Sequence, residues 1–156
     1  MTFKKKTKYT LKTFESTGTT SDVSANIYDS MILSEAYRSL SSKQRDLYTH
    51  CKLQLYRVAD KNKPDRLDPT QFYFNRYLWK HTYKLYSGGG GGFYKDMEQL
   101  IKKGFIRCLS SGKTARVKSI YQFSDKWRLY GTDEFCIYPN ELSMRDKDEG
   151  TDKETE

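Results

Sequence analysis

The sequence lacks the cysteine and histidine spacings that hold metals or support redox chemistry. Its three cysteines, Cys51, Cys108 and Cys136, are far apart, and no Cys-x-x-Cys or mixed Cys/His motif occurs. Zinc sites and thioredoxin-type redox centres are therefore not expected. Because the number of cysteines is odd and no secretory signal opens the chain, we expect a cytoplasmic protein without metal or cofactor.

Long apolar runs and catalytic motifs are also missing. No stretch comes near the roughly 18 apolar residues that a membrane span needs, so no membrane association is expected. The only histidines, His50 and His81, have no cysteine or paired carboxylate beside them and are expected to be surface or partly packed residues. Gly112-Lys113-Thr114 matches the end of a nucleotide-binding P-loop, but Arg107 stands where that motif requires its first glycine. We therefore predict that the protein is not an enzyme.

Acidic residues are concentrated at the C-terminal end. The net charge is +8 and the pI about 9.3, yet residues 145–156 alone carry −3, which leaves +11 on the remainder. A body this basic favours a polyanionic partner such as nucleic acid, although lysines can also serve solubility alone. The 13 Tyr, 8 Phe and 2 Trp argue against a disordered chain and predict a modest core of aromatic rings.

The composition predicts one domain with flexible ends. Residues 1–28 begin with lysines and continue with Ser and Thr, which predicts a disordered basic arm that either follows DNA phosphates or is an idle tail. Residues 29–139 are expected to form the folded domain. Residues 140–156 are expected to be an acidic disordered tail.

A capping box predicts the first long helix. Ser41 and Gln44 have the spacing at which each side chain bonds the other residue's backbone amide, so a helix is expected over 41–58. A shorter helix is expected before it, over 27–36. The apolar face of the long helix recurs at helical spacing and comprises Leu47, Tyr48, Cys51, Leu55 and Val58.

An aromatic strand and a second helix follow. Residues 72–74 read Phe-Tyr-Phe and predict a short strand. We expect the next helix to be capped at Asn75, with Leu78, Trp79 and Thr82 on one face. A helix that starts at Asp68-Pro69 is the alternative.

Five glycines, 88–92, precede a third helix. Glycine costs roughly 0.8–1 kcal/mol relative to alanine inside a helix, so the run is expected to lie mostly outside one, as a flexible connection or a loose helix entry. The helix itself is predicted over 93–103, with Gly104 as the left-handed residue that ends it. Its apolar face comprises Phe93, Met97, Leu100 and Ile101.

A hairpin is predicted to close the domain. Residues 105–109 predict a strand, residues 110–116 a polar loop and residues 119–124 the returning strand. Trp127 and Tyr130 are expected to cover the core, and residues 135–138 to form a last strand.

The order helix, strand, helix, turn, helix and hairpin is that of the winged helix-turn-helix, an α+β fold. The third helix of this fold docks into the DNA major groove, and its hairpin, the wing, lies along the backbone or the minor groove. The exposed side of the predicted third helix and the predicted wing are both basic here, apart from Glu98. The solvated polar face of any amphipathic helix would have a similar composition. The residues predicted to contact double-stranded DNA are Tyr94, Lys95, Gln99 and Lys102 on the helix, with Lys113, Arg116 and Lys118 on the wing.

Several stretches between Phe74 and Trp127 carry a family resemblance. They are Phe-Asn-Arg at 74–76, Leu-Trp at 78–79, Phe-Tyr-Lys-Asp at 93–96, Leu-Ile-Lys-Lys-Gly-Phe-Ile at 100–106 and Ser-Ile-Tyr-Gln-Phe-Ser-Asp-Lys-Trp at 119–127. The chain resembles the small winged-helix proteins of Gram-positive plasmids and integrative conjugative elements. It is more loosely similar to the N-terminal modules of plasmid replication initiators.

This resemblance implies sequence-specific DNA binding. It places the recognition helix on residues 93–103 and the wing on residues 110–118, although many such helices begin with a Ser or Thr cap where this chain has five glycines. Initiators usually carry a further domain for which this chain is too short. The resemblance therefore implies an accessory or regulatory role in replication, transfer or transcription of a mobile element.

Two other functions stay open on the sequence. Winged helices also bind proteins, and the aromatics and acidic tail would suit a protein-interaction module. The same Tyr, Phe and Trp side chains would stack on the bases of single-stranded nucleic acid. A second copy of the chain, or other proteins encoded by the same element, are further candidate partners.

Overall fold

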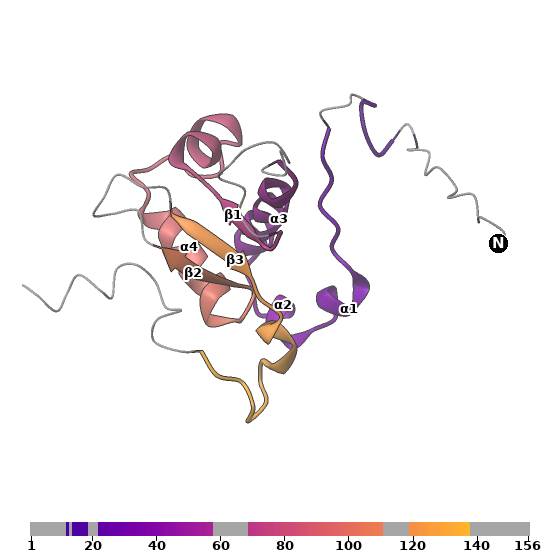
Figure 1. Ribbon diagram of the computed structural model, residues 1–156, viewed down its shortest axis with the longest axis vertical. Coiled ribbons are helices and arrows are strands. Elements are labelled where there is room, and N and C mark those ends of the chain that lie inside the picture. Colours follow the sequence, from indigo (N-terminus) through magenta and orange to yellow (C-terminus); the bar gives the residue numbers. More distant parts are fainter. Residues whose placement is uncertain (1–11, 13, 19–21, 58–68, 111–118, 138–156) are drawn as a thin grey trace, which may run out of the picture.

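A three-stranded antiparallel sheet with two long helices against one face forms the body of the protein (Figure 1). The computed structural model describes residues 12, 14–18, 22–57, 69–110 and 119–137. The strands, in the order β1-β3-β2, are β1 (Gln71–Tyr73), β3 (Ile120–Phe123) and β2 (Ile106–Ser110). The long helices are α3 (Ser42–Arg57) and α4 (Gly91–Lys102). The α+β class is confirmed, and the order of elements is compatible with a winged helix.

The sheet register places its apolar residues on the side that the helices cover. Phe72 of β1 pairs with Tyr121 of β3, which in turn pairs with Cys108 of β2. Phe72 and Tyr121 are buried, as is Ile106 two residues before Cys108. The described parts of both predicted strands of the hairpin are thereby confirmed.

Helix α3 starts as the capping box predicts. The Ser41 amide donates to Gln44 Oε1 at 3.0 Å, and the Gln44 amide donates to Ser41 Oγ at 3.2 Å. The predicted face holds, since Leu47, Tyr48 and Cys51 are buried and Leu55 is half-buried, whereas Val58 lies outside the described residues. Gln54 is buried beside them, and its amide donates to His50 O and to Tyr83 Oη, both at 3.1 Å.

The prediction of a single short helix over residues 27–36 is wrong, because the chain forms two short helices there. They are α1 (Asp29–Ile32) and α2 (Glu35–Arg38). Ser34 separates them with an extended backbone, and its hydroxyl accepts a hydrogen bond from the Tyr37 amide at 3.2 Å. A residue that caps the second helix in this way cannot continue the first one.

The Asn75 side chain caps the turn that follows β1, as predicted, but from Tyr77 the helix is wound as a π-helix, η1 (Tyr77–Thr82). Asn75 Oδ1 accepts from the Leu78 amide at 3.0 Å, and the Tyr83 amide reaches Leu78 O at 2.8 Å, an i→i+5 bond. This wider turn moves Thr82 away from the face of Trp79. Trp79 is therefore buried while Thr82 is exposed, which corrects the predicted shared face.

Helix α4 begins two residues earlier than predicted, inside the glycine run. Gly90 is its N-cap with φ 110°, and the Tyr94 amide bonds Gly90 O at 3.0 Å. Gly88 and Gly89 lie outside the helix. Gly91 and Gly92 thus lie inside the helix, and at Gly92 the backbone runs close to an aromatic ring, since a Cβ there would lie 3.2 Å from the Tyr86 ring.

The C-terminal end of α4 is fastened to the segment after β3. Gly104 has φ 82°, as predicted, and its carbonyl accepts from the Trp127 amide at 3.0 Å. Trp127 belongs to η2 (Lys126–Leu129), a 3-10 helix, and its indole lies parallel to the Phe105 ring at 6.2 Å. Trp127 and Tyr130 cover the core as predicted. The strand predicted at 135–138 is wrong over its described residues, 135–137, which form no strand.

Replacing Gly90 by alanine should destabilise the fold, whereas replacing its neighbour should not. Gly90→Ala is expected to lower the free energy of unfolding by about 1–2 kcal/mol, the cost of a left-handed backbone for an L-residue. Gly89→Ala is the matched control, since its Cβ would meet open space and its φ is not positive. Urea unfolding of both variants measures the difference. Equal stabilities would contradict the left-handed conformation at Gly90.

Candidate nucleic-acid interface

Helix α4 buries one side and presents the other to solvent. Phe93, Met97, Leu100 and Ile101 are buried, as the helical spacing predicts. The opposite side carries Lys95 and Lys102, which are exposed, and Gln99, which is half-buried. Tyr94 is exposed at the flank, with its ring centroid 5.2 Å from that of Phe93. We call these four predicted helix residues the outer face of α4. The structure therefore brings the predicted helix residues onto one accessible surface.

The two lysines of the outer face differ in their surroundings. Lys102 Nζ lies 2.7 Å from Glu98 Oε1, one helical turn away, and the Glu98 side chain is 21% exposed. Within the described part of the chain, no carboxylate pairs with Lys95. Lys95 is thus the cation of this face that is available to an incoming anion, while Lys102 must first leave its partner.

The other acidic residue of α4 is turned inward and holds the helix in place. Asp96 Oδ2 accepts from Tyr86 Oη at 2.7 Å, and Asp96 Oδ1 accepts from Gln44 Nε2 at 3.1 Å. Burial, followed by this hydrogen bond, raises the pKa of Tyr86. Asp96 therefore joins α4 to the start of α3 and to the turn before α4.

Lys103, at the end of α4, also has a structural role. Its Nζ donates to Ser39 O at 2.6 Å, and partial burial lowers its pKa. Asp96 in the middle of α4 and Lys103 at its C-cap therefore join this helix to α3, Tyr86 and Ser39.

The predicted wing residues, Lys113, Arg116 and Lys118, lie outside the described residues. The strands that lead to them are described, and β2 carries an irregularity between Cys108 and Ser110 near the turn. The described part of the hairpin is therefore present beside α4, but whether helix and wing residues act together stays a prediction.

The sequence analysis missed a polar row across the solvent side of the sheet. Both Nε and Nη2 of Arg107 donate to Gln122 Oε1, the former at 2.7 Å. Gln122 Nε2 in turn donates to Thr70 Oγ1 at 2.8 Å. The signal was available, because Arg107 follows the buried Ile106 in a strand and successive side chains point to opposite faces.

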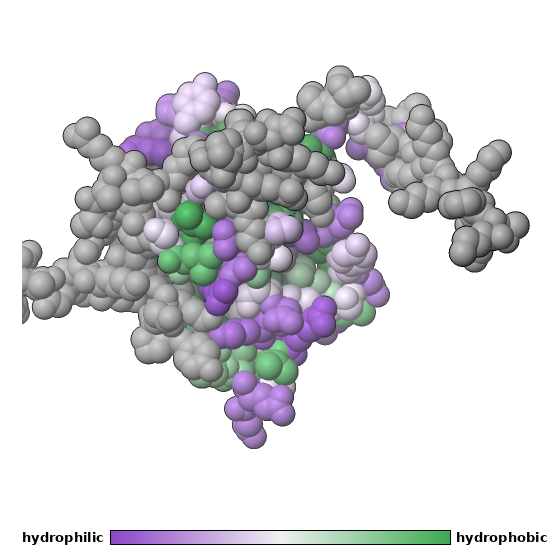
Figure 2. All heavy atoms as spheres, in the orientation of Figure 1, coloured by the Kyte–Doolittle hydropathy of each residue, from purple (hydrophilic) through white to green (hydrophobic). Residues whose placement is uncertain are grey.

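A groove of about 650 Å³ beside α3 was missed as well, and no residue of α4 lines it. Its lining comes from segments far apart in the chain, between Tyr28 and Arg128, so no local motif could have indicated it. Figure 2 shows that the described surface in this view mixes hydrophilic and apolar side chains instead of presenting one continuous apolar patch.

Comparison of the chain with models of known protein families, with curated proteins and with solved structures found no match. The resemblance to winged-helix proteins of mobile elements therefore stays a prediction. In the described part of the chain, no group of three His, Cys, Asp or Glu side chains is placed to hold a metal ion. No described helix is both long and apolar enough to cross a membrane.

Removing the Asp96 carboxylate should destabilise the domain. Asp96→Ala leaves the Tyr86 hydroxyl and the Gln44 amide without their acceptor, which is expected to cost about 1–3 kcal/mol of unfolding free energy. Asp133→Ala removes an exposed carboxylate and should stay within about 0.5 kcal/mol of the parent. Chemical denaturation compares the two variants. An effect at Asp96 as small as that at Asp133 would contradict the anchoring role.

Proposed function

We propose that the protein binds double-stranded DNA as a winged helix-turn-helix, with α4 as the recognition helix. The observation that carries this proposal is the outer face of α4, where Lys95, Gln99 and Lys102 reach solvent from a helix whose opposite side is buried. Lysine binds phosphate or guanine, and glutamine pairs with adenine in the major groove. These side chains suit both backbone attachment and base readout.

The start of α4 supports the same proposal. Its first turn has no acidic residue, and no side chain caps its amides. A helix N-terminus carries a partial positive charge and free N–H donors, and both favour a phosphate. A DNA phosphate placed there would supply the cap that the glycines lack.

The fixed position of α4 is a second supporting feature. Asp96 and Lys103 bind the helix to α3 and to Ser39, at distances of 2.6–3.1 Å. A recognition helix that is held in advance loses less conformational freedom on binding. The wing residues Lys113, Arg116 and Lys118 belong to the proposal as backbone contacts. The proposal also includes an accessory or regulatory role in a mobile element.

Lys95 should contribute more to duplex binding than Lys102. Lys95→Ala is expected to weaken binding and to lower the slope of log affinity against log salt by about one, as the loss of one phosphate contact does. Lys102→Ala should weaken binding less, because Glu98 already pairs with Lys102. Arg38→Ala, an exposed cation on α2, is the control.

The measurement is fluorescence anisotropy at several salt concentrations, with duplexes that the protein selects from a random pool. No salt-dependent binding to any duplex would overturn the proposal.

Removal of the acidic charge on α4 should strengthen duplex binding. Glu98→Gln frees Lys102 and removes repulsion toward phosphate, so the affinity should rise about two- to fivefold, the scale of one exposed ion pair. Glu134→Gln, which neutralises an exposed acid after η2, should change the affinity less. If both variants behave alike, α4 does not carry the contact. The same anisotropy titration reports both values.

A further inference from the structure

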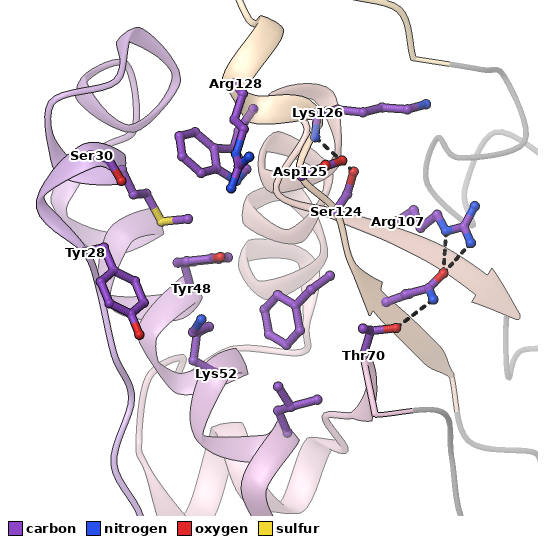
Figure 3. A pocket seen from close by; sticks show the side chains of 15 residues that line it. Tyr28, Ser30, Tyr48, Lys52, Thr70, Arg107, Ser124, Asp125, Lys126 and Arg128 are labelled. Carbon is purple, nitrogen blue, oxygen red and sulfur yellow. Dashed lines mark hydrogen bonds between the residues drawn. The ribbon is translucent and has the colours of Figure 1, made fainter.

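The groove beside α3 is lined by more cationic than acidic side chains. It lies between α1, α3, the end of β3 and η2 (Figure 3), with a volume of about 650 Å³. Four cationic side chains line it, against one carboxylate, Asp125. The cations are Lys52, Arg107, Lys126 and Arg128, of which Arg107, bonded to Gln122, and Lys126 point away from Lys52 (Figure 3). This excess of positive charge favours an anionic ligand.

Lys52 is the cation at the centre of the groove (Figure 3). Its Nζ lies 5.6 Å from the centroid of the Phe123 ring, and partial burial lowers its pKa. In the described part of the chain no carboxylate pairs with it. An ammonium group that has lost water without gaining a counter-ion is stabilised by an anion that enters beside it.

Aromatic rings stand around this cation. Tyr28 is 67% exposed although its ring lies on the groove wall, and Tyr48 is buried in the floor. Trp127 is half-buried, with the Arg128 guanidinium 5.4 Å from its ring centroid. Exposed aromatic rings beside arginine and lysine form platforms on which nucleic-acid bases stack.

We propose that this groove binds a nucleotide, with the phosphate at Lys52 and the base against Tyr28. The nucleotide belongs either to a single strand or to a free mononucleotide, which share this chemistry. A duplex does not offer an unstacked base, so the groove and the outer face of α4 take different ligands. The inference goes beyond duplex binding and does not depend on it.

The test uses the full chain and fluorescein-labelled (dT)12 in anisotropy titrations. Lys52→Gln and Tyr28→Ala are each expected to weaken binding at least about fivefold, the lower end of what one stacked base contributes. Arg38→Gln on α2, an exposed cation that lines neither the groove nor the outer face of α4, is the matched control and should leave this affinity unchanged. Unfolding curves identify any variant that fails to fold. If Lys52→Gln does not fold, the result for Tyr28→Ala decides the test, because Tyr28 is exposed and its replacement should leave the fold intact.

Competition with thymidine monophosphate distinguishes the two sources. Displacement of (dT)12 by the mononucleotide at a similar nucleotide concentration identifies a free nucleotide as the ligand, whereas displacement only by unlabelled oligomer identifies a single strand. Absence of binding, an unchanged affinity in folded Tyr28→Ala, or an equal loss in Arg38→Gln each overturns the proposal. Failure of duplex binding alone leaves this result unaffected, because (dT)12 contains no duplex.

Discussion

The stack of Trp79 on Phe93 is the contact on which the rest of the structure depends. The two rings lie 4.6 Å apart and are nearly parallel, and both are almost completely buried. Phe74 and Tyr86 meet Phe93 edge-on at 5.6 and 5.8 Å. Each such ring pair adds about 0.5–1.5 kcal/mol beyond the area it buries. Because Trp79 belongs to η1 and Phe93 to α4, this cluster sets the angle at which α4 meets the body.

The glycine run is explained by the same cluster. A Cβ on Gly90 would lie 3.3 Å from the Tyr94 ring and 3.7 Å from the Trp79 ring, and one on Gly92 would lie 3.2 Å from the Tyr86 ring. The backbone at the start of α4 thus runs directly along the aromatic side chains, where only a residue without a side chain fits easily. Gly88 and Gly89 have open space around them and are not constrained in this way.

Local signals in the sequence predicted most of the architecture. The Ser41 capping box, the spacing of Phe93 with Met97, and Gly104 each depend on residues that are close in the chain, so their structural effect can be deduced from the sequence alone. The four helix residues of the candidate interface followed from the same periodicity.

Features that depend on distant residues could not be predicted. The π winding of η1 places Trp79 against α4, and the burial of Gln54 requires the hydroxyl of Tyr83. In the sequence Asp96 resembles any acidic surface residue, and its structural role appears only when the fold brings Gln44 and Tyr86 within hydrogen-bond distance of it. The groove beside α3 is assembled in the same way from separate segments, which is why charge and spacing gave no sign of it.

The position of Phe105 has a consequence for how the chain folds during synthesis. Tyr37 and Tyr48 contact this ring, and both residues are synthesised well before Phe105. Trp127, which lies parallel to the same ring, is synthesised later, as is Gly131, whose φ of 83° disfavours a side chain. Such contacts between distant parts of a chain form slowly, and partly covered rings are prone to aggregation meanwhile. We therefore expect the contact between Phe105 and Trp127 to form only after the segment with Trp127 has left the ribosome.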